Sequence, residues 1–401
     1  MIKLYIKCDR IYCEEEILDG YLAVQDGTIM DLLPRSSEVD SFVDYTGYRI
    51  IPGIIDTHIH GINGFGLLGG DGAHPESEVR GFLKGCAGSG VTGVFPTVSP
   101  DMCRAAANVA KEQPDGARIL GIHSEGPYLN RVGENGVQTA APTVDMKLVQ
   151  QIYEDCDGFL KLMAIAPEIE GSQQVIDYLC AKNVVLSFAH SNCNYEEAMQ
   201  AFHHGLRVAT HTANVMSGIH HRNMGGLGAC LLNEEVYCEV ICDGLHVAPS
   251  MLELMFRVKD SDHWFMISDA SQACGAPVGT YKFWGDFTVT IDEDGFCKSD
   301  TGRLMGSTRT VLYGISVLAE QLHIPLEKII RLSSLNAARF YGFAERKGSL
   351  AVGKDADLVV INEEYQAVAT FVEGCKVFDA AMDTDLFNHD YLTKYLVEES
   401  A

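Results

Sequence analysis

Two histidines, His58 and His60, stand two residues apart directly after the apolar run from Ile50 to Ile55. Side chains at positions i and i+2 of a β-strand leave from the same face, so a strand here would bring both imidazoles to one spot. Imidazole nitrogens are common ligands of zinc and similar divalent metals. The spacing therefore fits a metal site, although two strand-end histidines satisfied by hydrogen bonds would show the same pattern.

Residues able to bind a metal or move a proton also follow the later apolar runs. In chain order they are Glu125, Glu168, His190, His211, His246 and Asp269. The parallel strands of a barrel place their C-terminal ends on one rim, and such rims carry the active sites of barrel enzymes. The pattern therefore predicts a polar rim that holds a divalent metal.

Eight short runs rich in apolar and β-branched residues are the predicted strands that position this rim. They span residues 50–55, 91–97, 118–122, 159–166, 184–189, 207–210, 236–241 and 265–268. Helix signals separate them, such as Asn194 followed by Glu196 and Glu197, a capping residue with an acidic first turn. This alternation predicts an α/β fold, a (β/α)8 barrel of the TIM type. A doubly wound open sheet is the alternative, but no G-x-G-x-x-G loop follows the first run.

The two ends of the chain predict a second, smaller domain. Residues 1–49 and 348–378 both alternate short β-type segments with turn signals, so we expect them to fold together into one β-sandwich. The predicted boundaries are 1–51 for the N-terminal part of the sandwich, 52–342 for the barrel, 343–385 for the C-terminal part of the sandwich and 386–401 for a C-terminal tail.

Composition excludes several classes of protein. The 401 residues carry a net charge of −25, which opposes binding to nucleic acid or to anionic membranes. Residues 1–20 lack the apolar core of a signal peptide, and no later run is long and apolar enough for a membrane span, so the cytoplasm is the expected location. The 13 cysteines, an odd number without a C-x-x-C motif, predict reduced and mostly buried thiols.

Several blocks of the sequence resemble a known family. The stretches Pro52 to Gly61 and Gly348 to Val360 are similar to the amidohydrolase superfamily, whose members join a metal-bearing (β/α)8 barrel to a β-sandwich built from both termini. Further stretches resemble the N-acetylglucosamine-6-phosphate deacetylases of that superfamily, at 121–130, 166–168, 189–192, 210–216, 242–247, 267–270 and 302–307. The resemblance implies a homodimer that hydrolyses the acetamide of N-acetylglucosamine 6-phosphate to glucosamine 6-phosphate and acetate.

Carried over position by position, the resemblance makes Glu125, His190 and His211 the ligands of one divalent metal. A carboxylate with two neutral imidazoles suits zinc or iron(II). His58 and His60 match the family members that hold a second ion, with Glu125 then available as a bridge. One or two ions are therefore expected.

The resemblance also assigns the proton-transfer chemistry. Asp269 matches an aspartate that acts as general base toward water activated by the metal, and then as general acid toward the departing amine. His246 matches a histidine that polarises the acetyl carbonyl and so stabilises the oxyanion. A loop histidine that contacts only sugar hydroxyls is the alternative for His246.

The residues that the resemblance assigns to substrate binding lie on further loops. They are Val137, Asn214, Val215, Arg222, His246, Leu304, Met305 and Gly306. Arg222 matches an arginine that pairs with the phosphate, for which its planar guanidinium is suited. The chain departs from the family here, since Asn223-Met224 replaces Glu-Pro, Val215 replaces Ala and Gln138 replaces His. The departures affect phosphate recognition and sugar identity, but they leave the expected metal ligands and the base intact.

Three other functions stay open at this point. The first is deacetylation of N-acetylgalactosamine 6-phosphate or of another N-acyl amino sugar or amino acid. The second is cyclic-amide hydrolysis, for which related enzymes use a carboxylated lysine as bridging ligand, and Lys161 is the candidate. The third is a non-catalytic barrel scaffold, which should have lost ligands or the base.

Overall fold

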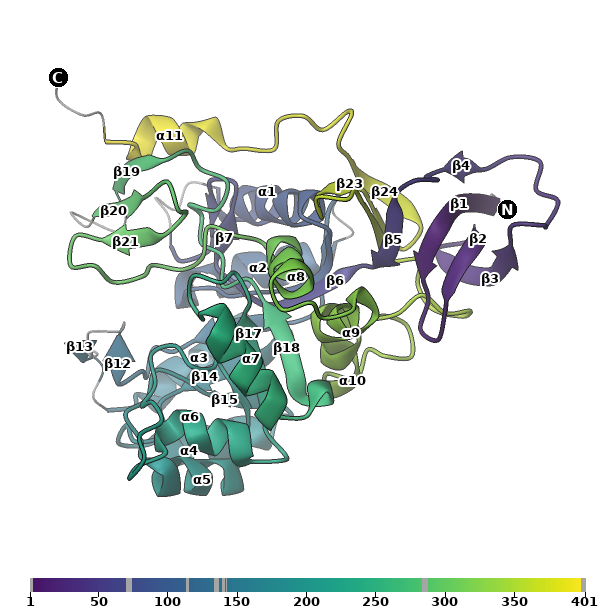
Figure 1. Cartoon of the computed structure of the whole chain (residues 1–401). Coiled ribbons are helices and arrows are strands. Elements are labelled where there is room, and N and C mark those ends of the chain that lie inside the picture. The colour runs from purple at the N-terminus through teal and green to yellow at the C-terminus, as the bar shows by residue number, and fades with distance from the viewer. Residues whose placement is uncertain are drawn as a thin grey trace.

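A computed structural model describes residues 3–69, 74–112, 115–132, 137–138, 141, 143–282 and 288–397 of the chain. Figure 1 shows a body of central strands surrounded by helices, with a second sheet beside it that contains the N-terminal strands and β23 and β24. The two parts therefore combine segments far apart in the sequence.

The central strands are parallel and follow the order expected from the sequence, except that the third predicted strand, 118–122, is divided between two short strands. Neighbouring strands form two sheets, β10-β9-β6 and β11-β14-β15-β16-β17-β18. Their bounds are β6 Ile54–Ile59, β9 Val91–Pro96, β10 Arg118–Ile119, β11 Ile122–Glu125, β14 Leu160–Ile165, β15 Val185–Phe188, β16 Leu206–Ala209, β17 Tyr237–Ile241 and β18 Trp264–Ile267. This is a TIM-barrel type of arrangement, which confirms the predicted fold class at that level.

Backbone contacts connect the two central sheets. A parallel bridge between Thr97 and His123 links the end of β9 to β11. The amide of Asp269 donates to the carbonyl of His58 at 2.9 Å, and the amide of His60 donates to the carbonyl of Ala270 at 2.8 Å. These bonds hold the C-terminal ends of β18 and β6 together, so residues from the first and last barrel strands share one rim.

Helices follow most of the strands and cover the central sheets (Figure 1). They are α1 Pro75–Gly88, α2 Cys103–Ala110, α3 Met146–Asp155, α4 Ser172–Cys180, α5 Tyr195–His203, α6 Gly225–Leu232, α7 Pro249–Val258, α8 Val311–Glu320, α9 Leu326–Ile330 and α10 Asn336–Phe340. A π-helical turn, Arg331–Leu335, joins α9 to α10. The predicted cap of α5 is confirmed, because Asn194 and Glu197 form a reciprocal capping box.

Both ends of the chain contribute to the second sheet, which we call the terminal sheet. Its strand order is β24-β23-β22-β5-β1-β2-β3, with β4 beside β1. The bounds are β1 Lys3–Tyr12, β2 Ile17–Gln25, β3 Thr28–Pro34, β4 Val43–Asp44, β5 Arg49–Pro52, β22 Leu358–Ile361, β23 Ala367–Val372 and β24 Cys375–Asp379. Antiparallel pairing of β5 with β22 joins the N-terminal strands to the C-terminal ones.

The first predicted strand, 50–55, is wrong as a single element. Its first half is β5 of the terminal sheet, and β6 of the barrel begins only at Ile54. Gly53 separates the two strands, and its amide donates to the carbonyl of Asp357 at 3.0 Å. A Cβ at Gly53 would lie 2.1 Å from the hydroxyl of Thr92, so this crossing between the sheets requires glycine. Apolar isoleucines stand on both sides of the break, so the run reads as one strand.

Smaller elements lie around the barrel. They are β7 Gly61–Ile62, β8 Phe65–Gly66, β12 Arg131–Val132, β13 Val137–Gln138, β19 Gly279–Lys282, β20 Thr288–Ile291, β21 Cys297–Ser299 and α11 His389–Tyr395. The aromatic rings of Tyr281 and Tyr391 stack with centroids 5.6 Å apart. The C-terminal helix α11 therefore packs on the antiparallel β19-β20-β21 sheet, and Figure 1 shows the two together.

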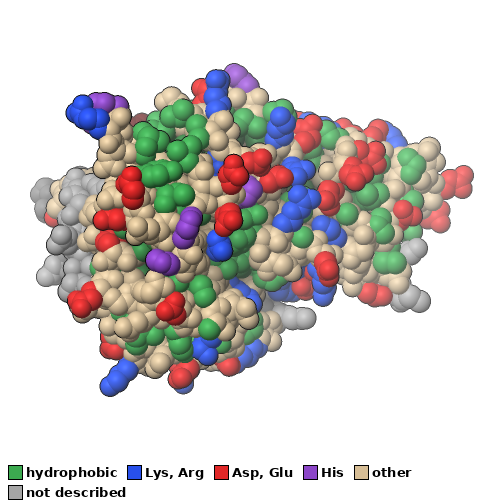
Figure 2. All heavy atoms as spheres, turned by 90° about the horizontal axis from the view of Figure 1, so that it is seen from below, with side chains coloured by type: hydrophobic (Ala, Val, Ile, Leu, Met, Phe, Trp, Pro, Cys, Tyr) green, Lys and Arg blue, Asp and Glu red, His purple; other side chains and the backbone are tan. Residues whose placement is uncertain are grey.

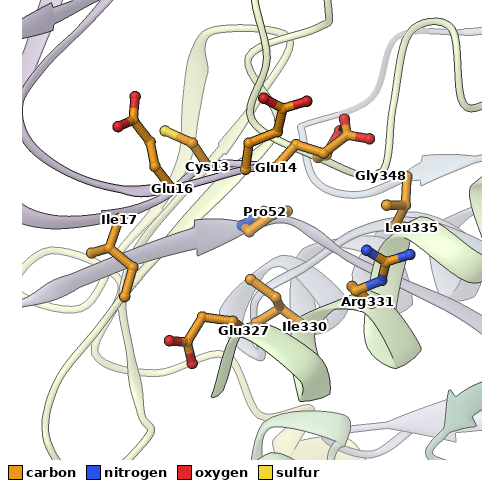
Figure 3. A pocket seen from close by; sticks show the side chains of 12 residues that line it. Cys13, Glu14, Glu16, Ile17, Pro52, Glu327, Ile330, Arg331, Leu335 and Gly348 are labelled. Carbon is orange, nitrogen blue, oxygen red and sulfur yellow. Dashed lines mark hydrogen bonds between the residues drawn. The ribbon is translucent and has the colours of Figure 1, made fainter. Parts of the chain in front are cut away.

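The terminal sheet meets the barrel at the N-terminal ends of the barrel strands. A pocket of about 260 Å³ lies there. The β1–β2 turn forms one side of it, and α9 with the π-helical turn forms the other (Figure 3). Pro52, just before β6, lies in its wall. The carboxylate of Glu14 accepts a hydrogen bond from Ser349 at 2.6 Å and pairs with Arg339 at 3.3 Å. This pocket lies at the opposite end of β6 from His60.

The cysteines and the surface agree largely with the composition. All 13 cysteines are free thiols within the described ranges; most are buried, as predicted, but Cys180 and Cys375 are exposed. Figure 2 shows acidic and basic side chains interspersed over one face. Among the described helices, none combines the length and apolar character needed to cross a membrane.

Candidate metal centre and active site

His58 and His60 lie at the C-terminal end of β6, and both are buried, with exposures of 0% and 7%. Their Nε2 atoms are 3.2 Å apart. Both face one oxygen of Glu125, which ends β11: Oε2 lies 3.0 Å from Nε2 of His60 and 3.6 Å from Nε2 of His58. Three side chains far apart in the sequence thus converge on one point.

His190 and His211 form a second pair on the other side of Glu125. They follow β15 and β16, and each Nε2 lies 3.0 Å from Oε1 of Glu125. The two Nε2 atoms are themselves 3.0 Å apart. Glu125 therefore presents one oxygen to each histidine pair, which is the arrangement of a bridging carboxylate.

We call His58, His60, Glu125, His190 and His211 the metal cluster. Its atoms form two groups, one on each oxygen of Glu125, in which one ligand atom from each residue lies within 4.8 Å of the others. Ligand atoms bound at about 2.0–2.1 Å to one tetrahedral ion lie roughly 3.3 Å apart. The observed separations of 3.0–3.6 Å between ring nitrogens and carboxylate oxygens fit that requirement. Imidazole and carboxylate donors suit zinc or iron(II).

Asp269 lies beside the His58 half of the cluster. Its Oδ1 is 3.4 Å from Nε2 of His58 and 3.3 Å from Nε2 of His60. Burial alone would raise the pKa of Asp269, but the neighbouring His58 and His60 lower it below its usual value. The carboxylate is therefore ionised at neutral pH, which is the state that a proton acceptor requires.

Three residues of the site adopt backbone conformations that are uncommon for side-chain-bearing residues. The φ angles are +47° at His190, +30° at His211 and +49° at Asp269. Each residue stands just after a barrel strand, where a left-handed turn changes the direction of the chain. Such conformations cost roughly 1–3 kcal/mol each and cluster at functional sites. The strain marks these strand ends independently of their chemistry.

Asp56 supports the strands that carry His58 and Asp269. Its carboxylate accepts a hydrogen bond from the Ser268 hydroxyl at 2.6 Å and from the amides of His58 and Ser268 at 3.2 and 3.3 Å. It thereby ties β6 to β18 directly beneath His58 and Asp269. Complete burial raises the pKa of Asp56 to about 7.

His246 occupies a loop after β17 and is held by a second acid. Its Nδ1 lies 2.8 Å from Oδ2 of Asp243, which also accepts a hydrogen bond from the Ser307 hydroxyl at 2.9 Å. Although burial raises the pKa of Asp243, its contacts with His246 lower it below the usual value. The ionised carboxylate fixes the imidazole ring and links it to the segment that contains Gly306.

The residues expected to contact the sugar lie on segments tied to the site. The amide of Ser307 donates to the carbonyl of Asp269 at 2.8 Å, and the amide of Met305 donates to the carbonyl of Cys297 at 3.0 Å. Leu304, Met305 and Gly306 are half-buried. This segment runs from the β19-β20-β21 sheet to the end of β18.

The residues expected to bind phosphate differ in their surroundings. Asn214 is buried and its amide group donates to the carbonyl of His211 at 3.2 Å, and Val215 follows it with a φ of +51°. Arg222 is exposed, and among the described residues its guanidinium has no ion pair or hydrogen bond. The side chain of Val137 lies outside the described part of the chain; its backbone pairs with Val132.

Two residues singled out in the sequence take other positions. Glu168 is exposed and binds the loop that follows His190, accepting hydrogen bonds from Ser191 at 2.8 Å and from the amide of Asn192 at 2.6 Å. Lys161 stands near the start of β14, whereas the residue paired with Glu125 on that strand is Ala164. Lys161 is therefore not placed as a bridging ligand, and the cyclic-amide alternative loses its candidate.

Sequence reasoning missed the acids behind the site. Asp56 and Asp243 stand inside recognised stretches but received no role, and Glu239 of β17 was overlooked. One signal was available for Glu239, because a carboxylate in the middle of the apolar run 236–241 has to be buried if the run is a barrel strand.

Comparison with known proteins agrees with this geometry. The model of the amidohydrolase family matches residues 49–379. The chain belongs to the amidohydrolase family. Among its relatives, the N-acetylglucosamine-6-phosphate deacetylase of Vibrio furnissii is 32% identical over 390 residues, which cover 92% of this chain and 94% of that protein. This places the amidohydrolase among the N-acetylglucosamine-6-phosphate deacetylases and makes it an enzyme.

Other relatives of this amidohydrolase extend the comparison. The N-acetylgalactosamine-6-phosphate deacetylase of Escherichia coli O157:H7 is 29% identical over 378 residues, 92% of this chain and 98% of that protein. The crystal structure of N-acetylglucosamine-6-phosphate deacetylase from Pasteurella multocida superposes with a TM-score of 0.82 and 26% identity, covering 94% of this chain and 99% of that chain. The relatives include deacetylases for both the gluco and the galacto sugar. The residues that bind the substrate therefore have to determine which of the two epimers is used.

Proposed function

We propose that this protein hydrolyses the acetamide of N-acetylglucosamine 6-phosphate, giving glucosamine 6-phosphate and acetate. The observation that carries the proposal is the placement of Glu125 between two histidine pairs, with Asp269 beside one of them. The similarity to the Vibrio furnissii enzyme over nearly the whole chain supplies the substrate. A non-catalytic scaffold would not need to retain all five residues of the metal cluster together with the carboxylate of Asp269.

The cluster would hold one or two divalent ions, with zinc or iron(II) the best match to its donors. Such an ion, when bound, polarises the amide carbonyl and lowers the pKa of water. Asp269 takes the proton of the attacking water on its carboxylate and returns it to the amine nitrogen as the C–N bond breaks. The bond that forms joins the water oxygen to the acetyl carbon, so acetate leaves with the oxygen of that water.

His246 is proposed to donate a hydrogen bond to the acetyl oxygen, where negative charge develops. Asp243 supports that role, because an ionised carboxylate 2.8 Å from Nδ1 stabilises the charged imidazole ring. The same carboxylate binds Ser307, next to Gly306. The sugar-binding segment and the oxyanion-stabilising histidine are thus held by one acid.

Phosphate is proposed to bind between Asn214, Val215 and Arg222, with Val137 contributing from its hairpin. Leu304, Met305 and Gly306 would contact the sugar. Support for Arg222 comes from its exposure and from the lack of any described partner for its guanidinium, which leaves it able to pair with a phosphate.

We further propose a cytoplasmic homodimer in which each subunit is a (β/α)8 barrel, residues 52–342, with a β-sandwich built from residues 1–51 and 343–385 and a tail at 386–401. The eight-stranded terminal sheet drawn from both ends of the chain supports that division. The net charge of −25 supports a partner set without nucleic acid or anionic membrane.

A second candidate substrate is N-acetylgalactosamine 6-phosphate. It is favoured by the 29% identity to the Escherichia coli deacetylase for that sugar and by the departures at Val215 and at Asn223-Met224. Other N-acyl amino sugars or amino acids share the same acetamide chemistry.

The test is acetate release by zinc-loaded or iron(II)-loaded protein from N-acetylglucosamine 6-phosphate, its galacto epimer and both unphosphorylated sugars. We expect the highest kcat/KM for the phosphorylated gluco compound. A higher value for the galacto epimer would select the second candidate, and no acetate from any of the four would contradict deacetylation. The Asp269→Asn variant, assayed beside the parent, controls for contaminating activity.

A further inference from the structure

Glu239 lies in the middle of β17, and its side chain is fully buried between the barrel strands. Its Oε1 accepts a hydrogen bond from the hydroxyl of Thr57 at 2.7 Å. Its Oε2 faces Nδ1 of His58 at 3.5 Å. Within the described residues, neither Oε2 of Glu239 nor Nδ1 of His58 has a hydrogen-bond partner. The carboxylate thus approaches His58 from the side of the ring opposite to the metal cluster.

A buried carboxylate without a cation is unfavourable, because the charge loses its hydration. In the described part of the chain, no Lys or Arg pairs with Glu239, and the charge nearest to its carboxylate would be that of His58 and of whatever His58 binds. Thr57 occupies Oε1 and so keeps Oε2 directed at the ring. The position of Glu239 is therefore explained by its effect on His58.

We propose that Glu239 is a positioning residue that makes the group of His58, His60 and Glu125 a working second cation site. It accepts the Nδ1 proton of His58, which leaves the lone pair on Nε2, the atom that faces Glu125 at 3.6 Å. Carboxylates that bind a ligand histidine in this way orient the ring and strengthen it as a donor. The inference rests on the metal assignment proposed above and goes beyond it.

The contact with Glu239 distinguishes His58 from other ligands of the cluster. Nδ1 lacks a hydrogen-bond partner among the described residues in His58, His60 and His211 alike, but of these three nitrogens it is that of His58 that faces a carboxylate oxygen, Oε2 of Glu239 at 3.5 Å.

The test is the number of ions bound by Glu239→Gln. A glutamine keeps the size of the side chain and can still accept from Thr57, which turns its NH2 group toward His58. That group donates to Nδ1 and favours the tautomer with hydrogen on Nε2, which cannot bind a metal. We expect dialysed protein loaded with cobalt(II) to fall from two ions per chain to one, with binding at the second site weakened about 10- to 100-fold.

Two reference variants are measured beside Glu239→Gln. His58→Asn should produce the same one-ion protein and the same cobalt absorption spectrum as Glu239→Gln. Thr92→Val removes a buried hydroxyl elsewhere in the barrel and should keep both ions. Glu239→Gln that binds two ions with affinities within twofold of the parent would overturn the inference alone. If the parent binds no ion, the metal assignment itself fails, and a parent that never exceeds one ion also overturns the role of Glu239.

A measurement on the unmodified chain covers the case in which Glu239→Gln fails to fold. Nitrogen NMR of zinc-loaded protein labelled in its histidines reports which ring nitrogen carries hydrogen, and the His58 signals are those missing in His58→Asn. We expect hydrogen on Nδ1 and zinc on Nε2 of His58. The reverse arrangement would rule out Glu239 as the acceptor.

Discussion

The metal cluster and the segment around Arg222 are two parts of one proposed site, yet they are built in opposite ways. The cluster residues stand at the ends of barrel strands and are buried or nearly so, each within 3.0–3.6 Å of another. The Arg222 loop, which we define as residues 217–224, is mostly exposed and carries a small hairpin between His220 and Asn223. The difference teaches that the barrel holds the groups proposed for the chemistry in place, whereas the residues proposed for phosphate recognition lie on a surface loop that can change without disturbing them.

This contrast predicts which kinetic constant each part controls. Damage to the buried part should lower kcat, because its groups act on the reacting atoms. Damage to the exposed loop should raise KM, because it contributes binding energy remote from the acetamide.

The largest effect is expected for Asp269→Asn. The amide cannot accept the proton of the attacking water, so kcat should fall by about 10²- to 10⁴-fold. Metal content, measured by mass spectrometry of the dialysed protein, should stay within the range of the parent. Unchanged kcat would remove Asp269 from the mechanism, and loss of metal would show that its main role is ligation.

Metal removal is expected to have the next largest effect. Glu125 and Asp269 are nearly buried carboxylates that face one another across His58 and His60, so withdrawal of a bound cation leaves their charges less compensated. At free metal about 100 times the Kd, binding contributes about 2.7 kcal/mol to stability. A chelator should therefore lower the Tm by several degrees and abolish acetate release, and added zinc should restore both. An unchanged Tm would mean that the cluster binds no ion tightly.

Much of the buried part could be predicted from the sequence, because strand ends are marked by local pattern. A polar residue just after an apolar run at His190, His211 or Asp269 is visible without a structure. The break at Gly53 was not visible, since β5 and β6 have the same apolar character and only the pairing of β5 with β22 separates them. Glu239 was missed for a related reason: its partners Thr57 and His58 lie 182 and 181 positions away, and no local pattern links them.

The exposed loop could be located from the sequence but its geometry could not. Arg222 lies in the turn of the hairpin that is bridged by His220 and Asn223, just before the start of α6, and no periodic pattern describes such a turn. The sequence therefore identifies Asn223 and Met224 as departures from the family, but it does not predict how they change the structure of the loop.

A smaller effect is expected for Arg222→Ala. The loss of a guanidinium that binds phosphate should raise KM for a 6-phosphorylated substrate roughly 10- to 100-fold, equivalent to about 1.4–2.7 kcal/mol, with kcat changed little. The unphosphorylated sugar, assayed in parallel, should show no change. His221→Ala is the matched control, since it removes a neighbouring exposed ring. Equal kinetics of the parent and Arg222→Ala on phosphorylated sugar would contradict the assigned role.

The smallest effect is expected for Asn223→Ala, which separates the shape of the loop from its charge. The Asn223 side chain accepts a hydrogen bond from the amide of Gly225 at 3.0 Å, at the start of α6. Its removal should destabilise the protein by about 1 kcal/mol, visible as a slightly lower Tm, because one orphan amide of the helix loses its partner. KM for the phosphorylated sugar should change by less than about twofold, which is under 0.5 kcal/mol. A rise as large as that of Arg222→Ala would mean that the conformation of the loop, rather than the guanidinium alone, determines phosphate binding.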